Sequence, residues 1–498
     1  MIRYSLLAAF IAFLSAYAFK DWFKSLCGLV VLMAVLERPD MPRSIMGIPG
    51  LNVWNILLFF VLLGWLASKK HEKRFWDMPG YMNFILLSYL FVVIVSSLRT
   101  MLDYSPLVAY AQMLGSSPDI GMGSMVIDYL VNTIKFAIPG ILIYEGCRDE
   151  ERAKWAVSSI LVAGFFLAIQ IIKEMPLSMM TDGDRLQKRA VRILDRRVGY
   201  HRVDLATLMA GLSWAFYAAR TVFTNKFIRL FLLFAAMICF LALSLTGGRS
   251  GYLAWAACGT VLALVRWRGL ILLGPVVVLI MFMTVPAVEE RLIEGFTEES
   301  HETGTAKLGV DTVDSRGNDL YAITSGRVIV WPEVIEGIKE RPYLGWGRKG
   351  YIVSGVLPGL VEEYGIWIRQ FGHPHNAYLQ LMIDAGIVGT LPVMVFYFLI
   401  CLYSLRLFRR KDPLSVMIGG LTFALVSTQL AASVGAQTFY PREGTLFMWA
   451  AIGLCLRFYF SPPEGKTETE QASNADDGRR IKFKRPSRTF LKKQGRRF

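Results

Sequence analysis

The stretch Phe371–Thr390, which reads FGHPHNAYLQLMIDAGIVGT, passes from a polar start into an apolar run. The run continues beyond this stretch, and residues 376–405 together are long and apolar enough to form a membrane-spanning helix. Asn376 is a favourable N-cap for that helix, because its side chain can accept a hydrogen bond from a first-turn N–H. The free N–H groups and the positive dipole end of the helix would then lie beside His373 and His375.

Two interpretations of this polar start remain open. A helix N-terminus favours an anionic group such as a phosphate, and a neighbouring histidine is a candidate base. The alternative is that both histidines are interfacial loop residues without a chemical role.

The composition predicts the class of protein. The chain has 498 residues, of which 54% are hydrophobic, and its mean hydropathy is +0.43. Repeated apolar runs near membrane-spanning length predict an all-α, polytopic membrane protein. The formal net charge is +15. In a membrane protein such an excess indicates basic loops on the cytoplasmic side, so we expect no nucleic-acid partner.

The apolar segments predict twelve or thirteen membrane helices. The second segment is short, so it either pairs with the first as a hairpin or one of the two does not span. The segments are residues 2–19, 22–36, 51–67, 81–98, 124–144, 154–173, 203–221, 227–246, 250–266, 269–287, 376–405, 414–434 and 444–460.

Lysine and arginine in the short loops predict the orientation. Five basic loops fall on one side of the membrane under the thirteen-segment count, and that side is expected to be the cytoplasm. A polar, basic tail follows on the same side; its composition predicts disorder, and it could touch anionic lipid head groups. The loops are residues 69–74, 148–154, 220–226, 266–268 and 406–411.

The chain divides into five expected regions. They are membrane helices with a basic external loop (1–202), membrane helices carrying LTGGRSG (203–288), a large external loop (289–375), C-terminal membrane helices (376–460) and the tail (461–498). The basic external loop, residues 173–202, breaks the charge rule. It could hold a polyanion, a lipid phosphate or a diphosphate, or it could be an amphipathic helix lying on lipid head groups.

Neither the cysteines nor the carboxylates are arranged as a metal site. The six cysteines have no metal-ligand spacing, and five lie in apolar segments, so we expect neither disulfides nor zinc. Glu362 and Glu363 are adjacent and poorly placed to share one ion. We therefore expect a metal-independent site with no cofactor.

Three stretches place charged or polar residues where an apolar segment meets the external face. LTGGRSG (245–251) carries Arg249 between glycines, SGRVIVW (325–331) carries Arg327 on a predicted loop helix, and HPHN (373–376) starts the long apolar helix. An arginine at such a boundary is costly unless it is paired or functional. Two arginines and a histidine facing one cavity would suit a diphosphate and an attacking hydroxyl.

These stretches, with GRVIVW…ERPYLGWG and HPHNAYLQLMIDAGIVG, resemble the O-antigen ligase family, which includes O-antigen polymerases and protein O-oligosaccharyltransferases. The resemblance covers roughly residues 202–402, and its most specific part is the HPHN stretch. The sequence departs from the family pattern at Gly248, where serine is common, and at Asp384, where glutamate is common.

The resemblance implies a metal-independent glycosyltransferase on the periplasmic face of the bacterial cytoplasmic membrane. Its donor would be a polyprenyl-diphosphate-linked glycan, and its acceptor a hydroxyl of lipid A core, another glycan or a protein. Arg249 and Arg327 would bind and stabilise the diphosphate, and His375 would activate the acceptor. His373 and Asn376 would be supporting residues that bind substrate. Apart from the resemblance, Arg202 of the basic external loop could bind an anionic part of the substrate. Trp331 and Trp346 could stack on sugar faces, although simple packing is the alternative for each. A repeat-unit polymerase is the next hypothesis, and a transporter of a lipid-linked or anionic solute is a third.

Overall fold

The structure is a computed structural model of the chain. It describes residues 2–461 except 43–44, 46–49, 73–75, 117–119, 294–323, 325, 366–367, 369–371 and 436–437. The described residues form helices joined by turns, which confirms the predicted all-α fold.

The first half of the chain forms long helices and several short helical segments. They are α1 (Ile2–Tyr17), α2 (Trp22–Leu36), α3 (Val53–Glu72), α4 (Gly80–Leu102), α5 (Ser105–Met113), α6 (Met122–Met125), η1 (Val126–Val131), α7 (Asn132–Ile134), α8 (Ile138–Gly146), α9 (Glu150–Glu174), η2 (Leu177–Thr181), α10 (Gly183–Arg197), α11 (Arg202–Ala219), η3 (Arg220–Val222) and α12 (Lys226–Leu245).

The second half contains the elements that carry the candidate site. They are α13 (Arg249–Val265), α14 (Gly269–Thr284), α15 (Pro286–Ile293), α18 (Arg327–Glu340), α19 (Gly350–Val353), α20 (Val356–Tyr364), α21 (Ala377–Phe408), α22 (Pro413–Ala432), η6 (Glu443–Thr445) and α23 (Leu446–Phe460).

Each of the thirteen predicted apolar segments lies on helix. Among the described residues, six helical segments are long and apolar enough to cross a membrane, and five further apolar helices are shorter. The protein is therefore a polytopic helical membrane protein, as predicted. The six are Gly80–Leu102, Met122–Gly146, Glu150–Glu174, Lys226–Leu245, Ala377–Phe408 and Pro413–Ala432.

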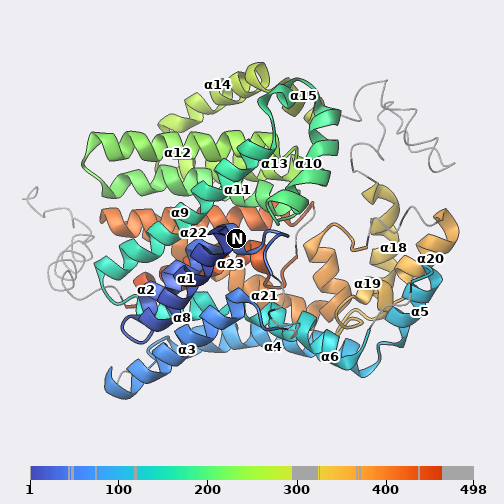
Figure 1. The fold of residues 1–498 in the computed structure, drawn as a ribbon. Coiled ribbons are helices and arrows are strands. Elements are labelled where there is room, and N and C mark those ends of the chain that lie inside the picture. Colours follow the sequence, from blue (N-terminus) through green and yellow to red (C-terminus); the bar gives the residue numbers. More distant parts are fainter. Residues whose placement is uncertain are drawn as a thin grey trace, which may run out of the picture.

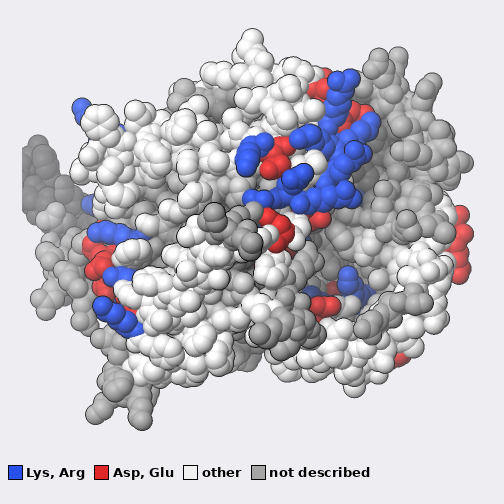
Figure 2. Space-filling view, viewed as in Figure 1, with Lys and Arg blue, Asp and Glu red and all other residues white. Residues whose placement is uncertain are grey.

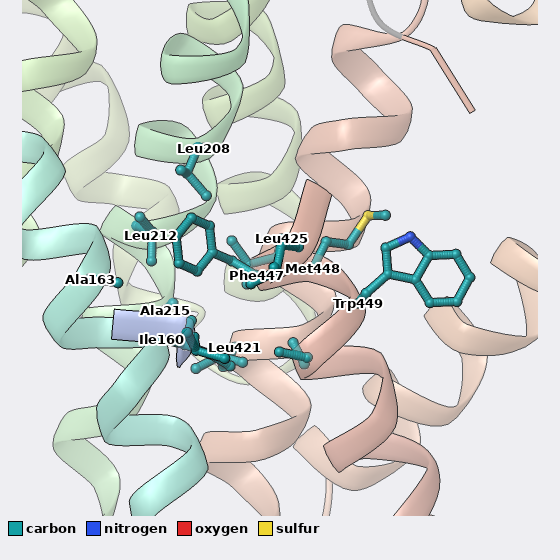
Figure 3. Close-up of a cluster of buried hydrophobic side chains, with 14 of the residues drawn as sticks. Ile160, Ala163, Leu208, Leu212, Ala215, Leu421, Leu425, Phe447, Met448 and Trp449 are labelled. Carbon is teal, nitrogen blue, oxygen red and sulfur yellow. The ribbon is translucent and has the colours of Figure 1, made fainter. Parts of the chain in front are cut away.

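The main hydrophobic core lies where α9, α11, α22 and α23 pack together (Figure 3). Ile160 of α9, Leu212 of α11 and Phe447 of α23 are fully buried there. Burying large side chains of this kind contributes roughly 1.5–3 kcal/mol each in water-soluble proteins. Inside a bilayer, close packing of the facing side chains contributes instead, so the fit between these helices is what holds the bundle together.

Hydrogen bonds gather the basic loops at one end of the bundle, the left side of Figure 1. Arg266 donates to the carbonyl oxygens of Phe408, at 3.4 Å, and Arg410, at 3.2 Å. Thr221 donates to the carbonyl of Pro413 at 3.3 Å. The prediction that these loops share one side is confirmed for the described residues, and that this side is the cytoplasm remains a prediction.

A second, smaller hydrophobic core lies at the opposite end of the bundle. α18, α19 and α20 pack there against the first turns of α21, on the right side of Figure 1. Its buried members include Val330, Val334, Tyr351 and Leu360. The helix predicted around Arg327–Lys339 is confirmed as α18. Most of the acidic half of the predicted external loop (294–323) and nearly all of the tail (462–498) lie outside the described residues.

Candidate functional site

The three stretches singled out in the sequence meet at the turn that follows α22, residues 433–435. Arg327 donates through Nη2 to the carbonyl of Gly435, and Ala377 N–H donates to the carbonyl of Ser433 at 2.8 Å. The start of α13 touches the same turn, because a Cβ placed on Gly435 would lie 2.9 Å from the Cβ of Ser250. This turn therefore brings LTGGRSG, SGRVIVW and HPHN together.

Arg327 is held at the start of α18 with spare hydrogen-bonding capacity. Its Nη1 donates to the carbonyl of Thr324 at 3.1 Å, while its buried Nε has no acceptor. Burial, together with the positive charge of Arg249, lowers the pKa of the Arg327 guanidinium to about 10. The side chain stays protonated at neutral pH, and the two mutually repelling cations would be stabilised by an anion between them.

Arg249 and Arg202 share one turn on the other side of the site. Arg249 opens α13, and Arg202 opens α11 and donates to the carbonyl of Gly247 at 3.2 Å. A Cβ on Gly248 would come within 2.9 Å of Ala206 Cβ, so the missing side chain lets α13 begin directly against α11. In this way LTGGRSG places its arginine beside Arg202.

The two histidine rings of the HPHN stretch contact each other at a tilt of 39°. Their ring centroids are 4.1 Å apart, and the N–H of His375 donates to Nδ1 of His373 at 3.2 Å. His375 has a φ of 52°, a conformation that is strained for a non-glycine residue and typical of functional sites. Burial, and then the charges of His375 and Lys349, lower the pKa of His373 to about 2, so His373 is neutral at physiological pH.

Asn376 caps α21 as predicted. Its Oδ1 accepts from the N–H groups of Tyr378, at 3.0 Å, and Leu379, at 3.2 Å. Trp331 joins α18 to the same stretch, because its Nε1 donates to the carbonyl of Pro374 at 3.0 Å. Both residues therefore hold the loop that carries His373 and His375.

Trp346 lies further along α21, away from this turn. Its indole donates to the carbonyl of Gly337 at 2.8 Å, its N–H donates to the carbonyl of Ile383 at 2.8 Å, and Arg341 lies over its ring at 3.9 Å. These contacts hold Trp346 at the far end of α18 from Arg327, so its contact with substrate remains a prediction.

The LGWG turn that contains Trp346 fills a break in α21. Gly386 has φ 62° and ψ −170°, which interrupts the helix in the middle of an apolar run. Ile387 and Val388 donate to the carbonyls of Pro342, at 2.9 Å, and Tyr343, at 3.1 Å. Gly347 N–H donates to the carbonyl of Asp384 at 2.8 Å. The turn thereby satisfies backbone groups that a membrane would otherwise leave unpaired.

Further polar residues at this end were not found by sequence reasoning. Buried Asp204, in the first turn of α11, forms an ion pair with Arg442. Burial lowers the pKa of His201, while the charge of Asp204 opposes that shift. The positive charges of Arg442 and His201 contribute to the lowered pKa of His373. The sequence signal that could have indicated this pair is Asp204 at the start of the apolar segment 203–221, because a charge there requires a partner.

The chemistry of this end is cationic and rich in hydrogen-bond donors. Among the described residues, no three His, Cys, Asp or Glu side chains gather as a metal-ligand set. Arg202, Arg249, Arg327 and the start of α21 together can bind an anion with several oxygens, and His375 can exchange a proton beside it.

Comparison with known proteins finds similarity over the part of the chain that carries most of this site. Residues 234–394 match the family model described as O-Antigen ligase. Over 119 residues the chain is 31% identical to the exopolysaccharide production protein ExoQ of Rhizobium meliloti (strain 1021). That alignment covers 23% of this chain and 27% of the relative. The chain thus spans about a quarter of that relative's length.

Proposed function

We propose, on the premise that residues 234–394 belong to the O-antigen ligase family, that this membrane protein transfers a glycan from a polyprenyl diphosphate to an acceptor hydroxyl. The observation that supports the proposal is the meeting, at the turn of residues 433–435, of the three stretches that carry Arg249, Arg327 and His375. A site with two protonated guanidiniums and a helix N-terminus matches a diphosphate in charge and in hydrogen-bond geometry.

The proposed reaction forms one glycosidic bond and breaks one sugar–phosphate bond. The acceptor oxygen attacks the anomeric carbon of the donor sugar, and the polyprenyl diphosphate leaves with the bonding electron pair. Arg249 and Arg327 stabilise the negative charge that develops on the leaving diphosphate. His375 accepts the proton of the acceptor hydroxyl. Neutral His373 holds His375 in place by accepting a hydrogen bond from its backbone N–H.

Lysine substitution tests the arginines directly. Arg327→Lys and Arg249→Lys keep the charge but remove the planar fork, and each should lose most of the turnover of the reconstituted protein. Arg341→Lys is the matched control, because Arg341 ends the same helix and is exposed. Turnover near the wild-type value in both site variants would show that neither arginine holds the diphosphate.

Metal independence is part of the proposal and needs its own experiment. Turnover of the reconstituted protein should persist in EDTA, because the arginines supply the positive charge. Loss of turnover on chelation, restored by Mg²⁺ or Mn²⁺, would contradict the metal-free reaction.

A polymerase of repeat units is the second candidate, and the similarity to an exopolysaccharide production protein favours it. Gene deletion separates the two reactions. Accumulated lipid-linked polymer indicates a ligase that attaches finished chains to lipid A core, protein or another acceptor. Accumulated single repeat units indicate a polymerase. Transport is less well supported, because the backbone groups at the break in α21 bond to the LGWG turn and do not line an open path.

We place the site end in the periplasm and the basic end in the cytoplasm of a bacterial inner membrane. Lys188 and Lys411 are exposed at the site end and the basic end respectively. Lys188→Cys should react with an impermeant thiol reagent in intact cells, and Lys411→Cys should not. The reverse labelling pattern would invert the orientation. Five of the six native cysteines are buried, which keeps the background low.

A further inference from the structure

The helix α10 presents a strongly basic face at the site end. It carries six basic and two acidic residues within fifteen positions. Figure 2 shows the blue side chains gathered where Figure 1 labels α10. Three of its apolar residues, Leu186, Ala190 and Leu194, are fully buried, whereas Val191 is exposed. The helix is therefore seated on the protein by its apolar side and turns its charges outward.

Contacts fix α10 against the elements that form the candidate site. Gly183 N–H donates to Glu290 of α15 at 2.6 Å, and Arg189 donates to the carbonyl of Glu174 at 3.0 Å. A Cβ placed on Gly247 would lie 3.7 Å from the Cα of Gln187. Gly247 belongs to the turn that positions Arg202 and Arg249, so the basic face begins directly beside the site.

Part of the basic face is only weakly compensated. Arg185 pairs with Asp182 at 3.0 Å and Lys188 with Asp184 at 3.1 Å, both exposed. Arg192, Arg196 and Arg197 are exposed and form no ion pair among the described residues, and one exposed carboxylate, Asp195, lies among them. A row with this excess of positive charge attracts polyanions over a distance set by ionic strength.

We infer that α10 binds the glycan itself, and that this glycan is an acidic polysaccharide with carboxylate groups along its chain. The inference rests on the proposed function and adds the substrate class. Fifteen helical residues span about 22 Å, longer than a diphosphate and comparable with several sugar units. Exposed arginines make individually weak contacts, so a polymer with repeated charges fits the helix better than one small anion.

The buried apolar side argues against lipid head groups as the occupant. An interfacial helix inserts its apolar face into the bilayer, whereas α10 packs that face onto α9, α11 and α15. The alternative that the sequence left open is therefore the weaker one, and it is an outcome of the experiment.

The test is binding of labelled oligogalacturonate, which has one carboxylate per sugar, to the full-length protein in phosphatidylcholine nanodiscs. Wild-type protein should bind it in a salt-dependent manner and should not bind neutral dextran oligosaccharides. The variant Arg192→Gln/Arg196→Gln/Arg197→Gln should bind about tenfold more weakly. The matched control, Lys226→Gln/Arg229→Gln/Arg268→Gln, removes three exposed charges at the basic end and should bind like wild type.

Each remaining outcome decides between the hypotheses. Equal oligogalacturonate binding by wild type and the α10 variant would overturn the inference. So would an α10 variant that loses binding only to phosphatidylglycerol vesicles, because that result assigns the face to lipid. Arg327→Ala should lose glycan transfer but keep oligogalacturonate binding. Failure of the transfer reaction therefore leaves the binding result interpretable on its own.

Discussion

Polar groups gather at two places along α21, its start and its break at Gly386. The two places differ in how many of those groups have a hydrogen-bond partner. At its start, buried Nε of Arg327 has no acceptor and His375 is strained at φ 52°. At its break, Asp384 accepts from Gly350 N–H at 2.7 Å and Tyr440 O–H at 2.9 Å, and the LGWG turn pairs with the backbone. Unused donors and strain indicate chemistry, whereas a carboxylate and backbone groups that find partners indicate architecture.

The largest expected effect comes from disturbing the backbone at the break in α21. Gly386→Ala should cost roughly 2–6 kcal/mol, because alanine is strained at positive φ and its Cβ would overlap backbone. The added Cβ would lie 2.3 Å from the carbonyl of Tyr343. Folded yield and thermal denaturation in detergent measure the effect.

Gly359→Ala is the control for that substitution, because a Cβ there meets nothing within 4 Å. A Gly386→Ala protein with wild-type yield and wild-type melting temperature would show that the break in α21 is dispensable for folding.

Replacing the histidines at the start of α21 should lower turnover and leave folding intact. His375→Ala should lower turnover by roughly 10² to 10⁴, the range for a general acid–base group. His373→Ala should cost less, since His373 acts through the N–H of His375. Turnover per monodisperse molecule is measured for both variants and for His375→Gln, alongside donor binding.

The outcomes of the histidine variants separate three roles. Loss of donor binding in His375→Ala would make His375 a diphosphate ligand instead of a base. A more severe loss in His373→Ala would reverse the two assignments. Lower yield with unchanged turnover per folded molecule would leave both histidines with a purely structural role.

Tyr440→Phe removes one hydrogen bond at the break in α21 and tests whether that bond serves folding alone. The hydroxyl of Tyr440 donates to Oδ2 of buried Asp384 at 2.9 Å, so its loss should destabilise the protein by roughly 1–3 kcal/mol. Turnover per folded molecule should not change. Thermal denaturation and turnover are measured on the same preparation, and a turnover defect without destabilisation would move this carboxylate into the reaction.

A pH dependence of stability is expected from His373, of a size similar to the effect of Tyr440→Phe. Its pKa is lowered to about 2 in the folded protein, so the unfolded chain binds the extra proton as pH falls below the ordinary value near 6.5. The contribution of His373 to the free energy of unfolding is therefore fully present at pH 7.5. It falls as the pH falls, by about 2 kcal/mol at pH 5.

The variant His373→Asn should reduce this acid sensitivity, because its Oδ1 can accept the same His375 N–H without titrating. Melting temperatures of wild type and variant are compared at pH 7.5 and pH 5. An equal drop in both proteins would assign the acid sensitivity to other groups.

The sequence by itself determined the membrane class, the helical segments, the shared side of the basic loops and the cap at Asn376. Each depends on local properties: hydrophobic length, charge between helices, or a side chain two or three residues from the N–H groups it bonds. It also indicated Arg249, Arg327 and His375 individually, because charged or polar groups at apolar boundaries are costly without a role.

That the stretches carrying these three residues meet is a property of the tertiary structure alone. Arg327 reaches Gly435 across 108 positions, and no pattern near either residue encodes that contact. The break at Gly386 was equally hidden, because an apolar run reports hydrophobicity and not φ, and the turn that fills it lies some forty residues earlier in the chain. Such contacts arise from how helices pack and where backbone groups find partners, and these depend on the whole bundle at once.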